Sequence, residues 1–177
     1  MQPPFERTWW VDEGNLLAGP FPGSASPDKT DIKLRALLDA GICTFVSLME
    51  PDEVNAAGDP FAPYDGRVHA LARGEVEIEL HRFPIVDFGT VSPASYRRIL
   101  DTIDRSIEAG RPVYVHCWGG HGRTGTVVGC WLSEHGVDGD DPLERIAWLR
   151  RHSEYLTAME SPQTEPQREV VRGWSSL

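Results

Sequence analysis

Short apolar runs along this chain alternate with longer segments in which apolar residues recur every three or four positions. The run ICTFVSLM at 42–49 is continuously apolar, rich in β-branched residues and too short for a helix, so it predicts a buried sheet strand. Apolar or alternating runs bounded by turn residues predict further strands at 15–23, 76–85 and 112–115.

Helices are predicted between these strands from apolar periodicity and from residues that favour helix ends. Serine followed by proline predicts helix starts at Ser26 and Ser92, because a serine side chain caps a helix and proline fits the first helical position. Apolar residues after Ser92 fall on one helical face, and Gly110 ends that helix. The predicted helices cover about 27–40, 93–109, 123–135, 141–151 and 164–174, with a short helix around 67–72.

Strands that alternate with helices predict the α/β class, with a single central, mostly parallel sheet flanked by helices. The length of 177 residues fits one domain over 1–177, since a domain takes roughly 150 residues. In parallel sheets of this kind, ligands bind beyond the carboxyl ends of the strands. The turn after the strand at 112–115 is therefore the first candidate site.

Charge and composition narrow the partners and the compartment. The chain has 17 basic and 27 acidic side chains, a net charge of −10 that would repel nucleic acid and anionic membranes, so neither is expected as a partner. Only Lys29 and Lys33 are lysines, so an anion site is expected to use arginine or backbone amides. Three cysteines cannot all pair, no secretion signal opens the chain, and no apolar run approaches the roughly 18 residues that span a bilayer. A cytoplasmic protein is expected.

The segment HCWGGHGRTG at 116–125 combines a thiol with glycines, an arginine and a threonine. The glycines let the backbone curl so that successive N–H groups point into one hollow, and the following helix adds its positive N-terminal end. A phosphate group fits such a hollow. The residues expected to line it are Trp118, Gly119, Gly120, His121, Gly122 and Arg123.

Three side chains of this glycine-rich turn supply chemistry for a phosphate. Cys117 lies at the rim of the hollow, where the amides, the helix end and Arg123 favour the thiolate. Arg123 can hold two phosphoryl oxygens with its planar guanidinium, and Thr124 can donate its hydroxyl to the sulfur. His116 is expected to be a buried residue that hydrogen-bonds near the turn.

Other uses of these residues agree less well with the rest of the sequence. Gly120 to Gly125 matches the G-x-G-x-x-G pattern of dinucleotide sites, but too little chain follows to supply a second strand with its ribose-binding acid. Zinc bound by the nearby histidines and cysteines is disfavoured by their spacing and by the charge of Arg123, so no metal or other cofactor is expected. Cys43 and Cys130 are expected to be core thiols, with a regulatory disulfide to Cys117 left open.

A cysteine, five residues, an arginine and a threonine, preceded by a histidine, resemble the signature of the cysteine-based protein tyrosine phosphatase superfamily. The similarity extends over about 14–174, apart from 51–75. It implies a protein tyrosine phosphatase-like fold and attack of Cys117 on phosphorus. A phosphocysteine intermediate that water hydrolyses would follow, without a cofactor.

The resemblance also implies a general acid on a loop. The segment PIVDFGTVSP at 84–93 supplies Asp87 just after a predicted strand. It resembles the Pro-Ile-x-Asp-Gly-Gly pattern of the kinase-associated phosphatase type within the dual-specificity branch, with Phe88 in place of the first glycine. QTEPQ resembles the glutamine loop of the family, which makes Gln163 and Gln167 candidates for positioning the hydrolytic water.

The expected function is therefore hydrolysis of phosphotyrosine, and also of phosphoserine or phosphothreonine, in phosphorylated proteins or peptides. A phosphoinositide or other small-molecule phosphatase is the nearest alternative, although that branch carries lysines where this chain has Trp118 and His121. Sulfur transfer of the rhodanese type and a catalytically silent phosphoprotein-binding module are further alternatives. The pattern of residues leaves the oligomeric state open.

Overall fold

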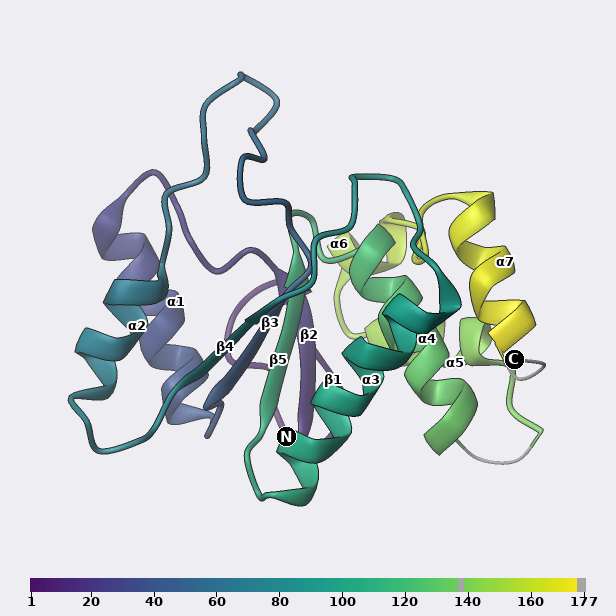
Figure 1. The fold of residues 1–177 in the computed structure, drawn as a ribbon, viewed down its shortest axis with the longest axis horizontal. Coiled ribbons are helices and arrows are strands. Elements are labelled where there is room, and N and C mark those ends of the chain that lie inside the picture. The colour runs from purple at the N-terminus through teal and green to yellow at the C-terminus, as the bar shows by residue number, and fades with distance from the viewer. Residues whose placement is uncertain (137–138, 175–177) are drawn as a thin grey trace.

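Five strands form one sheet in the order β1-β2-β5-β3-β4 (Figure 1). The computed structural model describes residues 1–136 and 139–174. β1 pairs antiparallel with β2, whereas the other neighbouring strands are parallel. The predicted α/β class with a single, mostly parallel sheet is confirmed. The strands are β1 (Trp9–Asp12), β2 (Leu16–Pro20), β3 (Thr44–Ser47), β4 (Glu79–Arg82) and β5 (Val113–Cys117).

Helices cover both faces of this sheet, with α1 and α2 on one side and the later helices on the other (Figure 1). Ser26 and Ser92 cap α1 and α3 as predicted, each accepting a hydrogen bond from a backbone N–H of the first turn. Among the described residues, no helix is both long and apolar enough to cross a membrane. The helices are α1 (Pro27–Asp39), α2 (Asp65–Ala72), α3 (Pro93–Glu108), α4 (Gly122–His135), α5 (Pro142–Arg150), α6 (Glu154–Ala158) and α7 (Glu165–Gly173).

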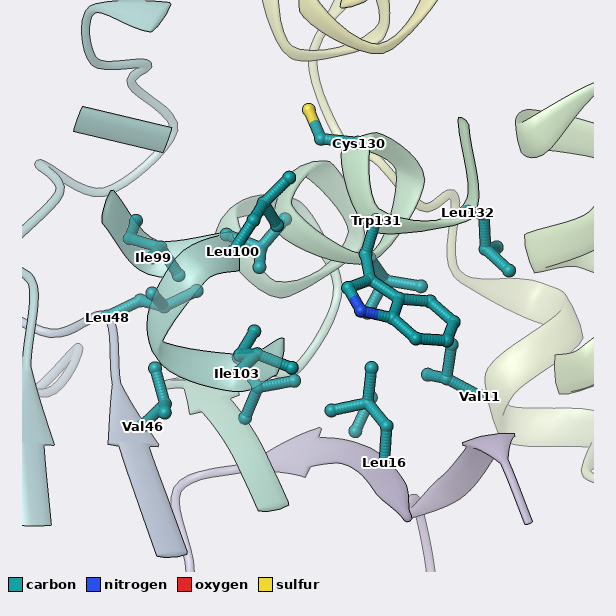
Figure 2. Packing of buried hydrophobic residues seen from close by; sticks show 14 of the residues in the cluster. Val11, Leu16, Val46, Leu48, Ile99, Leu100, Ile103, Cys130, Trp131 and Leu132 are labelled. Atoms are coloured by element: carbon teal, nitrogen blue, oxygen red, sulfur yellow. The ribbon is translucent and has the colours of Figure 1, made fainter. Parts of the chain in front are cut away.

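The alternation of side chains along each strand gives the sheet two apolar cores. Leu16 of β2 belongs to the core under α3 and α4, whereas the next residue, Leu17, belongs to the core under α1 and α2. Figure 2 shows the first core, in which Ile103 of α3 and Trp131 of α4 pack over strand residues such as Leu16 and Val46. The two cores fix the sheet between two helical layers.

Two elements lie outside the predicted pattern, and one strand is shorter than predicted. β1 contains Trp9 and Trp10, which point into opposite cores and are 0% and 8% exposed, so both pack against the sheet. The short helix α6 has no periodicity long enough to be read from sequence. The strand predicted at 76–85 is limited to β4, the edge strand, and Val76 is exposed.

Parallel pairing brings three loops to one edge of the sheet. β5 lies in the middle of the order, between β2 and β3, and ends at Cys117. The loop after β3 carries Glu53, and the loop after β4 carries Asp87. The carboxyl ends of parallel strands share an edge, so these loops surround the glycine-rich turn that leads into α4.

Candidate active site

The glycine-rich turn after β5 curls tightly against the end of β2. Gly120 adopts φ +77°, and a Cβ there would lie 2.5 Å from the carbonyl carbon of Gly19, so only glycine fits. The N–H of Phe21 donates to the carbonyl oxygen of Trp118 (3.0 Å), which ties the turn to the chain after β2. The N–H of Gly120 donates to Sγ of Cys117 (3.3 Å). A backbone amide therefore already points at the sulfur, as a hollow for an anion requires.

His116 holds the first residue of the turn from inside the core. It is fully buried, and burial lowers its pKa to about 3, so the ring is neutral. The hydroxyl of Tyr64 donates to Nε2 (2.7 Å), which leaves the ring proton on Nδ1 to donate to the carbonyl oxygen of Cys117 (3.3 Å). The expectation of a buried histidine bonded near the turn agrees with this geometry.

Arg123 is the most constrained charge of the site. Its side chain is fully buried, and Nη1 and Nη2 donate to the two carboxylate oxygens of Glu53 (2.6 and 2.8 Å). Nη1 also donates to the carbonyl oxygen of Ile85 (3.1 Å), and Nη2 lies 2.9 Å from Oδ1 of Asp87. This bidentate geometry is the strongest form of a charge-assisted pair.

Glu53 was not among the predicted site residues, although a signal for it existed. It follows β3, the parallel neighbour of β5, and so it comes to the same edge of the sheet as Cys117. Glu53 could have been predicted as an acidic residue that follows a buried strand, because such a strand is expected to lie in the same parallel sheet as the strand before the candidate turn.

The bonds of Arg123 leave one side of its guanidinium for a ligand. Nε is buried and has no hydrogen-bond partner among the described residues, and Nη2 is shared with Asp87. A phosphoryl group that takes Nε and Nη2 would replace Asp87 while Glu53 keeps its two bonds. Nη2 of Arg123, the predicted phosphate clamp, therefore contacts Asp87, the predicted acid.

The loop that carries Asp87 has a defined conformation despite the replacement of a glycine. Phe88 occupies the left-handed region, with φ +59°, where glycine is favoured, and its N–H donates to Oδ1 of Asp87 (3.1 Å). The hydroxyl of Thr164 donates to the carbonyl oxygen of Phe88 (3.4 Å), and Nε2 of Gln167 donates to that of Gly89 (3.1 Å). The start of α7 therefore holds the acid loop in place.

The two predicted glutamines have different surroundings. Gln167 is fully buried, and its Oε1 accepts from the N–H groups of Gln163 and Thr164 (3.1 and 3.2 Å) in a capping box at the start of α7. Gln163 lines the cavity over Cys117. Gln167 thus supports the backbone, and Gln163 has the better position to contact water in the cavity.

Thr124 is buried, and its Oγ1 has no hydrogen-bond partner among the described residues. The predicted bond from this hydroxyl to Cys117 is not formed in the structure. The hydroxyl is an unused donor next to the turn, so its role toward the sulfur stays a prediction.

His121 meets a buried arginine that no sequence pattern indicated. Nη2 of Arg150 donates to Nδ1 of His121 (2.8 Å), so the ring proton is on Nε2, which is buried without a partner among the described residues. Burial and then the charge of Arg150 lower the pKa of His121 to about 4. His121, which belongs to the wall of the cavity over Cys117, is therefore neutral and adds no second cation there.

A cavity of about 300 Å³ lies over Cys117. Its walls include Asp87, Phe88, Trp118 and Tyr155. The cavity brings together a thiol, an acid and the amides of the turn, with apolar sides for the rest of a ligand. Such a set of groups can transfer a phosphoryl group to sulfur and then to water.

Metal-ligating side chains gather elsewhere. Within 1–136 and 139–174, one group of three such side chains comes together, formed by Asp104, Glu134 and His135. Asp104 accepts from the indole of Trp131 (2.8 Å), and Glu134 accepts from Arg97 (2.6 Å). Asp104 and His135 line a hollow of about 450 Å³, larger than the one over Cys117, but none of its lining residues within the described part of the chain carries a thiol or hydroxyl.

The chain resembles a described family over most of its length. The family model for the DSP-PTPase phosphatase domain of Swiss Army Knife proteins, PTP-SAK, matches residues 6–170. The protein tyrosine phosphatase domain-containing protein 1 of Mus musculus is 30% identical over 124 residues, which is 70% of this chain and 16% of that protein. The chain spans at most half the length of the first curated relatives that it matches.

Solved structures share the fold at low sequence identity. Tk-PTP in its active form has a TM-score of 0.70 at 23% identity, covering 97% of this chain and 98% of its own. Kinase associated phosphatase with serine at its catalytic site cysteine has a TM-score of 0.69 at 20% identity, covering 99% and 96%. PTPMT1 in complex with PI(5)P has a TM-score of 0.66 at 20% identity, covering 97% and 98%.

Loss of the Glu53 carboxylate is expected to destabilise the protein. Glu53→Ala leaves the buried charge of Arg123 with Asp87 as its remaining acid, so the free energy of unfolding should fall by about 3 kcal/mol in urea titrations. Asp52→Ala removes an exposed carboxylate from the same loop and is the matched control, with an expected change within about 0.5 kcal/mol. Equal free energies of unfolding for the two variants would contradict a stabilising ion pair between Glu53 and Arg123.

Acid is expected to destabilise the fold through His116 and His121. Their folded pKa values, about 3 and about 4, lie below the unfolded value of 6.5, so below pH 6.5 the unfolded state binds more protons. The free energy of unfolding should therefore fall as pH drops from 6.5 toward 4, by up to about 1.4 kcal/mol per pH unit for each histidine. Urea titrations across this range measure it.

The control for the acid effect is His69→Gln, which removes an exposed histidine and should leave the slope unchanged. His116→Gln should reduce the slope. A free energy of unfolding that stays flat between pH 6.5 and 4 would show that neither ring is kept neutral by the fold.

Proposed function

The chain belongs to the PTP-SAK family of DSP-PTPase phosphatase domains, in the dual-specificity branch of the cysteine-based protein tyrosine phosphatases, and on that premise we propose that it hydrolyses phosphomonoesters through a phosphocysteine intermediate. One observation carries the proposal. Arg123, which contacts Asp87 at 2.9 Å, follows a turn whose amide donates to Sγ of Cys117, and Cys117 and Asp87 line one cavity.

In the first step, Sγ of Cys117 attacks phosphorus, so that a sulfur–phosphorus bond forms and the bond to the ester oxygen breaks. The amides of the turn and the free edge of Arg123 hold the phosphoryl oxygens. A phosphoryl dianion that displaces Asp87 from Nη2 also favours the protonated acid, because two negative charges repel each other. Protonated Asp87 then gives its proton to the leaving oxygen.

In the second step, water attacks the phosphocysteine and the sulfur–phosphorus bond breaks. Asp87, now ionised, takes a proton from that water, which restores the acid for the next cycle. Gln163 lines the same cavity and is proposed to orient the water. Inorganic phosphate leaves, Asp87 releases its proton to solvent, and the carboxylate returns to its ion pair with Arg123 until the next substrate binds.

Phosphotyrosine in proteins is the proposed substrate, because Phe88, Trp118 and Tyr155 give the cavity aromatic sides that suit an aryl ester. A small-molecule or phosphoinositide monoester is the second candidate. It is supported by the guanidinium of Arg7, which lines the cavity, and by the similarity to a structure of PTPMT1 with PI(5)P.

Cys117→Ser should abolish hydrolysis of p-nitrophenyl phosphate while retaining phosphate binding, because serine is not ionised at neutral pH. Release of p-nitrophenolate measures the rate. Cys43→Ser, which alters a buried thiol of the α1–α2 core, is the control and should keep its activity. Absence of any turnover that depends on Cys117 would favour the phosphoprotein-binding module instead.

Asp87→Asn should lower kcat by about 10² to 10⁴ for esters with poor leaving groups, and by much less for p-nitrophenyl phosphate, whose leaving group needs no proton. Steady-state rates on phenyl phosphate and p-nitrophenyl phosphate test this. Glu79→Gln, on β4, is the comparison and should have little effect. A loss of kcat in Glu79→Gln with no loss in Asp87→Asn would show that Asp87 is not the general acid.

A further inference from the structure

A second cavity adjoins the one over Cys117. It has a volume of about 340 Å³, and Arg7 and Trp118 line both cavities. One indole ring and one guanidinium therefore stand at the boundary between them. Aromatic side chains form much of the wall of the second cavity, namely Phe5, Phe21, Phe61 and Trp118.

Two cations line this second cavity, Arg7 from the N-terminal segment and Lys33 from α1. Glu6 lines it as well, but within the described residues no carboxylate lies at ion-pair distance from Arg7 or Lys33. Burial, then the charge of Arg7, lowers the pKa of Lys33. Two cations that repel each other at a half-buried site favour the binding of an anion between them.

Arg7 is fixed at the boundary with donors to spare. Nη2 donates to the carbonyl oxygen of Gly119 in the turn (3.1 Å), and the guanidinium carbon lies 4.4 Å from the ring centroid of Tyr155. Nε is buried and has no partner among the described residues. The backbone of Arg7 has φ +71°, a conformation that persists only where contacts hold the residue in place.

Lys33 also keeps unused donors. Nζ donates to the carbonyl oxygen of Gly23 (3.4 Å) and lies 5.8 Å from the ring centroid of Phe5. An ammonium has three donors, so two stay available to a ligand. The sequence predicts anion sites made of arginine and amides, whereas the fold brings one of the two lysines to this cavity.

We propose that the cavity of Arg7 and Lys33 binds a second, non-reacting phosphoryl group of a substrate whose scissile phosphoryl group lies over Cys117. The inference rests on the proposed phosphatase activity, and it favours the second candidate substrate, a small-molecule or phosphoinositide monoester, over phosphotyrosine in proteins. Arg7 contacts the turn and lines both cavities, so it links the two sites. Arginine and lysine at one site suit a phosphate, which accepts several charge-assisted hydrogen bonds.

A compact substrate fits this arrangement better than a peptide. Arg7 and Trp118 belong to the walls of both cavities, so the two cavities are neighbours and a small ring that carries both phosphoryl groups is proposed to reach both. A peptide would have to order its backbone and two side chains to do the same, at a cost in conformational entropy. Inositol phosphates and phosphoinositide headgroups share this compact chemistry.

The experiment compares kcat/KM for soluble inositol bisphosphates with that for inositol monophosphates. A second arm compares phosphatidylinositol bisphosphate with phosphatidylinositol monophosphate in phosphatidylcholine vesicles, and a third compares doubly with singly phosphorylated tyrosine peptides. We expect the second phosphoryl group to raise kcat/KM about ten- to a hundredfold in the soluble or the vesicle arm. A preference for the second phosphoryl group in the soluble arm would identify a free inositol phosphate as the substrate, and the same preference in the vesicle arm would identify a lipid headgroup.

The variants are Lys33→Met and Lys29→Met, which remove the two lysines of α1. Lys29 is exposed and outside the cavity, so it is the matched control and should keep the full preference. Lys33→Met should reduce the ratio of the two kcat/KM values toward one. A preference that survives in Lys33→Met, or a ratio near one in the wild type, overturns the second site.

Binding measured without turnover separates this inference from the proposed function. Calorimetry with Cys117→Ser should show tighter binding of inositol bisphosphate than of the monophosphate, and Lys33→Met in that background should remove the difference. If no ester is hydrolysed but the difference persists, the phosphatase activity fails and the second anion site stands. A stronger preference for the doubly phosphorylated peptide would overturn the compact substrate.

Discussion

The site depends on one buried charge, the guanidinium of Arg123. Removing such a charge from water is costly, and the fold offsets this cost with the two oxygens of Glu53 and with Asp87. Glu53 lies in the loop after β3 and Asp87 in the loop after β4. Their ion pairs with Arg123 therefore also hold these two loops in position. The positions of Arg123, the proposed phosphate clamp, and of Asp87, the proposed acid, are therefore consequences of the same electrostatic requirement.

Positive charge is concentrated around the turn of a protein whose net charge is −10. Arg123 is paired with carboxylates, whereas Arg150 is buried against His121, and its pKa is lowered to about 10 by that burial. Arg7 contacts the turn from the N-terminal segment. Local burial, and not the overall charge, thus explains how this edge of the sheet could bind the proposed anionic substrate.

Backbone geometry contributes as much as charge. Gly120 allows the turn to pass against Gly19, and Phe88 accepts the left-handed conformation because α7 holds the carbonyl groups of its loop. Gln167 illustrates how one residue connects elements, since it caps α7 and binds the acid loop with the same amide. The site is assembled from rigid elements, and rigid positioning is what transfer of a phosphoryl group requires.

The sequence alone determined the α/β fold class and most helix starts, and it predicted Cys117, Arg123 and Asp87 as site residues, because capping, periodicity and a contiguous turn are local properties of the chain. The same locality explains what it missed. Glu53, Arg150 and the packing of Trp9 and Trp10 depend on which strands become neighbours. Arg7 contacts the turn, and Lys33 lines the neighbouring cavity, only after β1 and α1 pack against the sheet. Tertiary structure decided which charges are buried together, because burial and pairing energies depend on distances in space, which spacing along the chain does not specify.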